Sequence, residues 1–219
     1  MEKLKLLRRL AEHLITSEIG ELRELTSLID NLLTEEVKRF SSRIDKMAQE
    51  LSKEEQDEYY EWQSDDYWRF SEAFPNVTAS SLFVTNYSFL EYQLLLICKS
   101  LHSIKNFPIK LSDLKGEGIF LARNYLKKVV GLSDFPDQTT HWNEICQYNR
   151  IRNFVVHNNS QLNDSDGANA IKLYIKNKSS ITLDANDRFQ ISLKFITEEI
   201  DTIEAFFKDF LKSLDNWIK

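Results

Sequence analysis

The scarcity of helix-breaking residues limits what this chain can fold into more than any other feature of its sequence. Only five glycines and three prolines occur in 219 residues, a content too low for an all-β sandwich, a collagen-like chain or a disordered linker. Hydrophobic residues make up 42% of the chain, and this length is enough to bury one sizeable core. We therefore predict a single, mainly α-helical domain over residues 1–219.

The spacing of apolar residues predicts the first helices. A first helix is followed by a second helical stretch from Thr34 to Ser71, which is strongly acidic and then aromatic. The second stretch should end before Pro75, because proline disfavours helix in the residue before it. Residues 1–74 are thus expected to form N-terminal helices that include an acidic, aromatic arm. In the first helix, apolar residues recur three and four positions apart: Leu4, Leu7, Leu10, Leu14, Leu22, Leu25, Leu28, Ile29 and Leu32.

Residues 77–160 are expected to form a helical core. Ser112 suits the N-cap of one of its helices, and Gly131 suits the end of the same helix. The last helix should end at Asn158–Ser160, because asparagine and serine favour caps and turns. Its apolar residues form one stripe, as in a helix with one buried face: Ile145, Tyr148, Ile151, Phe154 and Val155. The expected helices cover about residues 77–101, 112–130 and 137–158.

The apolar period changes after a polar loop at residues 161–169. Apolar and polar residues then alternate, which is the period of a strand: Ile171, Leu173 and Ile175, followed by short runs at Ile181, Leu183, Phe189 and Ile191. We expect a small β-hairpin or a three-stranded meander within residues 169–192. The helical period returns over residues 193–219, which should form the C-terminal helix.

The net charge of −6 is unevenly distributed along the chain. Residues 1–92 carry −8, residues 93–178 carry +5 and residues 179–219 carry −3. A local basic field can attract a phosphate-bearing partner even when the whole protein is acidic, although many such lysines only keep a surface solvated. Three cations of the basic segment fall on one helix face and are candidate phosphate-binding residues: Arg123, Lys127 and Lys128.

One motif in the basic segment carries a family resemblance. The stretch RNFVVHN, residues 152–158, resembles the R-x4-6-H motif of the HEPN superfamily, small α-helical domains of prokaryotic defence and toxin systems. As in that family, an asparagine follows the arginine, an aliphatic residue precedes the histidine, and the motif lies late in the chain. Arg8 and His13 have the same spacing but lack these neighbours.

The resemblance implies a fold and an activity. The fold would be a mainly α, HEPN-like helical bundle with a long acidic N-terminal arm and a small β-hairpin before the C-terminal helix. The activity would be that of a metal-independent endoribonuclease with no cofactor, in which a homodimer interface assembles the active site. Arg152 and His157 would be catalytic, Asn153 would position them, and Arg150 would assist phosphate binding.

Helix geometry and chemistry agree with a site made from two copies. RNA cleavage needs a base for the 2′-OH, an acid for the 5′-oxygen and a cation for the phosphorane charge. Histidine can transfer protons near neutral pH, and arginine can hold a phosphate through two hydrogen bonds. However, Arg152 and His157 lie roughly 140° apart around a helix, so a single helix does not aim both at one atom.

The biological role that follows is that of a toxin or abortive-infection effector. It would cut tRNA or mRNA in the cytoplasm when an antitoxin or another regulatory protein partner releases it. We expect no membrane partner, because the sequence contains neither an apolar run near 18 residues nor a recognisable signal peptide.

Three alternatives follow from the same residues. The arginines and His157 could simply cap the carboxyl end of their helix, in a non-catalytic HEPN-like interaction or nucleotide-binding module. Internal packing best explains the aromatic residues of the segment 54–70, although they could also anchor a protein contact. Cys98 and Cys146 lie in apolar helical patterns without zinc-site spacing, so we expect buried free thiols rather than ligands.

Overall fold

A computed structural model shows a mainly helical chain and describes residues 1–162 and 166–219. Seven α-helices are present in the described residues, with two short strands forming a hairpin before the last helix. In this part of the chain, no helix is both long and apolar enough to cross a membrane. The elements are α1 Glu2–Ala48, α2 Lys53–Trp68, α3 Phe74–Lys105, α4 Gly118–Tyr125, α5 Thr140–Asn158, α6 Asp166–Ile175, β1 Ile181–Leu183, β2 Phe189–Ile191 and α7 Leu193–Ile218, with a 3-10 helix Leu111–Asp113 and π-helices Arg69–Ala73 and Leu126–Val130.

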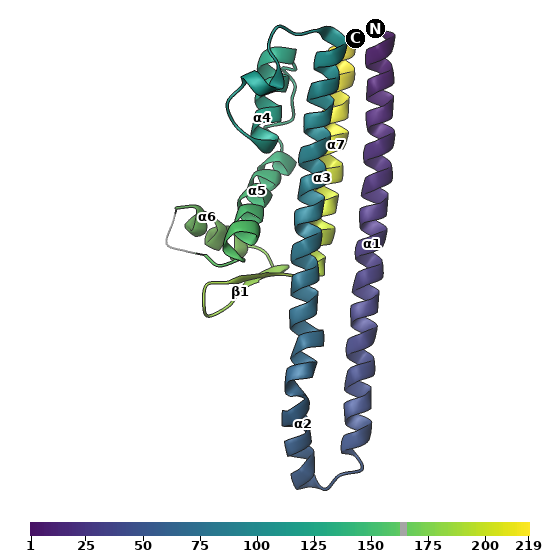
Figure 1. Cartoon of the computed structure of the whole chain (residues 1–219), viewed down its shortest axis with the longest axis vertical. Coiled ribbons are helices and arrows are strands. Elements are labelled where there is room, and N and C mark those ends of the chain that lie inside the picture. Colours follow the sequence, from purple (N-terminus) through teal and green to yellow (C-terminus); the bar gives the residue numbers. More distant parts are fainter. Residues whose placement is uncertain (163–165) are drawn as a thin grey trace.

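Three long helices form the body of the molecule. Helices α1, α3 and α7 lie side by side, and both chain termini lie at the same end (Figure 1). Helices α4, α5 and α6 and the hairpin lie on the other side of α3 from α1 (Figure 1). Buried side chains of all these helices join one hydrophobic core, as expected for a chain of this size.

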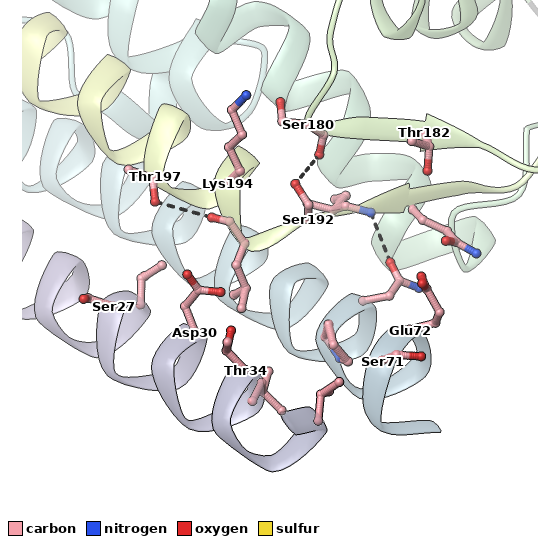
Figure 2. A pocket seen from close by; sticks show the side chains of 18 of the residues that line it. Ser27, Asp30, Thr34, Ser71, Glu72, Ser180, Thr182, Ser192, Lys194 and Thr197 are labelled. Atoms are coloured by element: carbon pink, nitrogen blue, oxygen red, sulfur yellow. Dashed lines mark hydrogen bonds between the residues drawn. The ribbon is translucent and has the colours of Figure 1, made fainter. Parts of the chain in front are cut away.

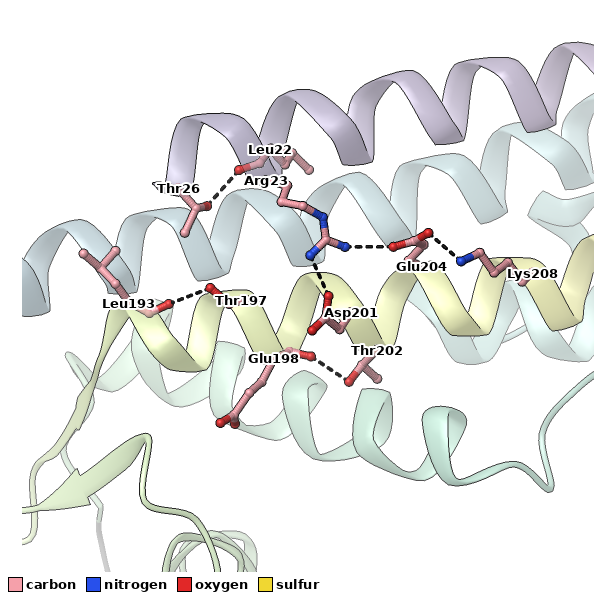
Figure 3. A network of polar contacts seen from close by, with 10 residues as sticks. All are labelled: Leu22, Arg23, Thr26, Leu193, Thr197, Glu198, Asp201, Thr202, Glu204 and Lys208. Carbon is pink, nitrogen blue, oxygen red and sulfur yellow. Dashed lines mark hydrogen bonds and ion pairs between the residues drawn. The ribbon is translucent and has the colours of Figure 1, made fainter. Parts of the chain in front are cut away.

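Ion pairs fix α1 against α7. The Arg23 guanidinium on α1 lies 2.6 Å from a carboxylate oxygen of Asp201 and 2.8 Å from one of Glu204, both on α7 (Figure 3). Glu204 also pairs with Lys208 on its own helix (Figure 3). Closer to the termini, Arg8 pairs with Asp215 at 2.8 Å. These partly exposed ion pairs add to the contact that buried residues of α1 make with the core.

The predicted N-terminal arm is present, but its helices divide differently. Helix α1 continues without a break through residue 34, so its second half and α2 form a two-helix hairpin that extends past α7 (Figure 1). We call residues 34–73 the arm. Phe40 packs on Phe70 with ring centroids 5.3 Å apart, and α2 begins with a capping box between Ser52 and Glu55.

The helix that leads out of the arm does not end before Pro75, so this prediction was wrong. Residues Arg69–Ala73 form a π-helix that leads directly into α3, with Pro75 in the first turn of α3. The Phe74 amide donates to the carbonyl of Arg69, five residues earlier. Proline cannot donate to a carbonyl four residues before it and crowds that carbonyl. A wider turn at this point accommodates the proline and lets the helix continue.

The predicted strand at Ile171–Ile175 is also wrong, because this segment belongs to α6. Ile171 and Ile175 are buried, whereas Leu173 is 65% exposed, so burial follows a spacing of four residues rather than two. No three-stranded meander forms among the described residues. The two strands β1 and β2 pair antiparallel, with Ile181 opposite Ile191. Within the expected loop at 161–169, residues 163–165 lie outside the described part.

Two helix starts in the core were placed wrongly. The stretch expected to be helical from Ser112 begins with a 3-10 turn, and α4 starts only at Gly118, where φ is +58°. Its continuation ends at Gly131, with φ of +78°, as predicted. Helix α5 begins at Thr140 rather than near Asp137, because the Thr139 hydroxyl accepts a hydrogen bond from the Trp142 amide as N-cap.

Candidate functional site

Helix α5 buries most of the apolar stripe expected from its sequence, whereas Phe154 and Val155 are only half-buried. Ile145, Tyr148 and Ile151 are buried, and the Tyr148 ring packs edge-on against Phe83 of α3 and Phe195 of α7. These contacts hold α5 by one face. The polar residues of the RNFVVHN motif therefore lie on the remaining faces of a rigid core helix.

The motif ends at a defined helix terminus. Asn159 and Ser160 both have positive φ, +50° and +61°, and both amides donate to the carbonyl of Phe154. Asparagine tolerates this left-handed conformation better than most residues. The predicted end of α5 is thus confirmed.

Arg152 is held against α3. Its guanidinium lies 5.9 Å from the centroid of the Tyr87 ring, and one terminal nitrogen donates to the Asn153 side-chain oxygen at 3.1 Å. The Tyr87 hydroxyl accepts a hydrogen bond from Asn149 at 2.6 Å. Burial raises the pKa of Tyr87, so the ring stays neutral. The Nε of Arg152 is buried and has no hydrogen-bond partner in the described residues.

His157 differs from Arg152 in being exposed. It makes no hydrogen bond or ion pair with any described residue, and the adjacent Val156 is 48% exposed. Arg150 is also exposed and donates to Gln147 at 3.1 Å. Within one chain the structure therefore does not bring Arg152 and His157 into contact, as their angular separation on the helix predicts.

Two of the three predicted phosphate-binding cations are already paired. Arg123 and Lys127 both bind the carboxylate of Asp137, whose side chain is only 3% exposed. Burial by itself would raise the pKa of Asp137, but hydrogen bonds from Lys127 and Arg123 outweigh it and hold that pKa below its ordinary value. Lys128 is exposed and forms no ion pair with a described residue. The predicted cationic face is therefore partly neutralised.

The two cysteines of the chain are free thiols. Burial raises the pKa of the Cys146 thiol, and the charges of Arg150 and Arg123 both oppose that rise. Cys98 is buried, and Cys146 is half-buried; neither forms a disulfide.

The structure adds one cation that the sequence did not suggest. Arg188, at the start of the returning hairpin strand, donates its Nε to the carbonyl of Asn159 at 3.0 Å. The Phe189 amide binds the carbonyl of Ser160 at 3.1 Å, so the hairpin is fixed to the end of α5. Arg188 also lines a cavity of about 690 Å³ together with Val155, Asn159 and Ser160. No local sequence pattern points to this contact, because it joins residues 29 positions apart.

A larger cavity of about 1020 Å³ lies between the arm, the hairpin and the start of α7. Many of its side chains carry hydroxyl groups, but the Ser192 hydroxyl donates to the Ser180 carbonyl at 2.6 Å and that of Thr197 to the Leu193 carbonyl at 3.4 Å (Figure 2). Asn76, which also lines this cavity, accepts a hydrogen bond from the Ile191 amide at 3.1 Å. These groups hold the fold together and indicate no particular ligand.

No family model, no curated protein and no solved structure matches this chain. The likeness to HEPN proteins therefore depends on the motif and its surroundings. Among the described residues, no group of three or more His, Cys, Asp and Glu side chains is placed to hold a metal ion.

Proposed function

We propose that the chain is a metal-independent endoribonuclease of the HEPN type, with its site on the C-terminal half of α5. One observation carries the proposal: residues 147–160 contain two arginines, one histidine and four asparagines but no carboxylate. Arg188 adds a further guanidinium at the end of this segment. Such a surface favours the phosphates of RNA.

The proposed site is completed by a second copy of the chain. Arg152 is anchored on Tyr87 and His157 projects into solvent from another side of the helix, so one copy supplies the two groups at separate places. Val156 offers an exposed apolar side chain beside His157, suited to contact between two α5 helices. A homodimer through this surface would place His157 of each copy near Arg152 of the other.

The chemistry then needs no metal. One His157 takes the proton of the 2′-OH, the 2′-oxygen attacks phosphorus, and the second His157 gives its proton to the departing 5′-oxygen. The P–O5′ bond breaks, leaving a 2′,3′-cyclic phosphate and a 5′-hydroxyl. Arg152 stabilises the negative charge on the phosphorane, and Arg150 binds a neighbouring phosphate. This is the role of a toxin or defence effector that acts on tRNA or mRNA under control of a protein partner.

The test is cleavage of total RNA in the presence of EDTA. Wild-type protein should cut RNA, whereas His157→Ala and Arg152→Ala should lose at least about 100-fold in rate. His13→Ala is the matched control, because His13 is also exposed and follows an arginine by five positions. Intact RNA with wild type under several conditions, with no growth defect when the protein is expressed, would refute the proposal.

A second candidate is a non-catalytic helical interaction module. The observation that favours it is the packing of Arg152, which stacks on Tyr87 and binds Asn153 without any substrate. In that case Arg152→Ala lowers the melting temperature, while wild-type protein leaves RNA intact. If the module holds a nucleotide, nucleotides should raise the melting temperature without being consumed.

A further inference from the structure

A row of exposed leucines runs along α1. Its members are between 44% and 57% exposed although leucine is usually buried, and we call them the leucine row: Leu6, Leu10, Leu14, Leu25, Leu28 and Leu32. At about 100° per residue they fall within an arc of roughly 100° on one side of the helix. The residues of α1 that enter the core, such as Ile15 and Ile19, lie outside this arc. A row of this kind marks an interaction surface.

The row is nearly symmetric about its own centre. It spans about 39 Å of helix and consists of two groups of three leucines on either side of Ile19. Suppose that a second α1 lies antiparallel, with the two Ile19 residues at the same height along the helices. Then Leu6 faces Leu32 and Leu10 faces Leu28. Leu14 lies beside Leu25 in the same register. Self-complementarity of this kind is what a two-fold interface requires.

The charges along α1 fit the same orientation. Residues 2–10 carry a net charge of +3 and residues 28–36 carry −3. Within one chain, Arg8 already pairs with Asp215 and Glu35 with Lys38. An antiparallel pair places the basic segment of each copy against the acidic segment of the other, with Lys3 opposite Glu35. A parallel pair would place like charges together along the whole row, which is unfavourable.

We propose that the leucine row is a self-association surface through which two copies of this chain pair by antiparallel α1 helices. This surface is separate from the proposed ribonuclease site, because α5 lies on the other side of α3 and α7 from α1 (Figure 1). Pairing through α1 therefore does not bring two α5 helices together. The inference stands whether or not the chain cleaves RNA.

A charge exchange tests both the surface and its orientation. The mass of the full chain would be measured by sedimentation for wild type, Leu10→Glu, Leu28→Lys and the double variant. Glu at 10 would face the acidic segment 28–36 of the other copy, and Lys at 28 would face its basic segment 2–10. Because like charges repel, each single variant should dissociate this contact and its mass should fall by half. In the double variant Glu at 10 faces Lys at 28 of the other copy, so the wild-type mass should return.

Matched controls separate this effect from misfolding. Leu173→Glu changes an equally exposed leucine on α6 and should leave the mass unchanged, and circular dichroism should show that every variant keeps its helix content. A monomeric wild type, or single variants with unchanged mass, would overturn the proposal. If the double variant stays dissociated, the antiparallel orientation is wrong.

Discussion

Glu199 is the residue of this protein that fits least well in a hydrophobic core. It is fully buried on α7 and accepts a hydrogen bond from the Asn86 side-chain amide at 3.0 Å. The other carboxyl oxygen of Glu199 and the amide oxygen of Asn86 both lack a hydrogen-bond partner among the described residues. Burial raises the pKa of Glu199 well above its ordinary value, and the hydrogen bond from Asn86 only partly opposes this. A proton on the free carboxyl oxygen could bind Asn86 Oδ1 and satisfy both atoms.

We therefore predict that Glu199 is neutral in the folded protein and that Glu199→Gln becomes increasingly stabilising as pH rises. The unfolded chain loses this proton near pH 4.5, whereas the folded protein holds it to a higher pH. The stabilising contribution of the pair is thus complete below pH 4.5 and is lost as pH rises towards the folded pKa. Over that interval, the free energy of unfolding of wild type should fall relative to the variant by about 1 kcal/mol per pH unit.

Denaturant unfolding at several pH values measures this gap. Glu198→Gln is the control, because Glu198 is adjacent but only half-buried, where it accepts a hydrogen bond from Ser180. If the gap between wild type and Glu199→Gln stays constant from pH 4 to pH 8, Glu199 does not carry the proton.

At the scale of elements, the spacing of apolar residues predicted most helices. It failed where the same residues fit both the period of a helix and the period of a strand. The alternation of apolar residues from Ile171 to Ile175 fits a strand, yet positions 171 and 175 are also one helical turn apart. Tertiary packing selected the helix, since Ala168, Ile171 and Ile175, spaced three and four positions apart, are buried in the core. The helix end predicted before Pro75 was wrong for a different reason. A π-helical turn accommodates the hydrogen bond that proline cannot make, and no local sequence rule predicts such a turn.

If residues 171 and 173 lie on a helix, substitutions at the two positions should affect stability differently, whereas in a strand they should affect it alike. Ile171→Ala should lower the free energy of unfolding by about 2–4 kcal/mol, because it leaves a cavity in the core. Leu173→Lys should change it by less than about 0.5 kcal/mol, because this side chain already faces solvent. In a strand, side chains two positions apart share a face, so both changes would be costly. Comparable losses for the two variants, measured by urea unfolding, would contradict the assignment.

For the whole molecule, the sequence located the motif but not what surrounds it. The end of α5 and most of its buried stripe follow from local pattern and are confirmed. The pairing of Asp137 with Arg123 and Lys127, and the contact of Arg188 with Asn159, depend on how distant segments pack. The arm was expected to bury its aromatic residues or to anchor a contact. Trp62 is 77% exposed and α2 buries no side chain, which favours the contact.

Two separate surfaces are proposed to pair with other copies of the chain, the leucine row on α1 and the Val156 side of α5. Two isologous contacts on different sides of one protomer build assemblies larger than a dimer. We therefore predict that wild type exceeds the mass of a dimer, and that Leu10→Glu or Val156→Glu alone reduces it to a dimer. Both changes together should give a monomer. Sedimentation velocity distinguishes these species.

The two single variants should differ in activity. Leu10→Glu leaves the α5 surface intact, so it should cleave RNA at the wild-type rate. Val156→Glu places a charge in the apolar contact beside His157, so it should lose at least about 100-fold in rate because the composite site no longer forms. Loss of cleavage in Leu10→Glu with an unaltered Val156 surface would mean that α1 pairing, rather than α5 pairing, assembles the site. Because α5 lies across the bundle from α1, the structure argues against that outcome (Figure 1).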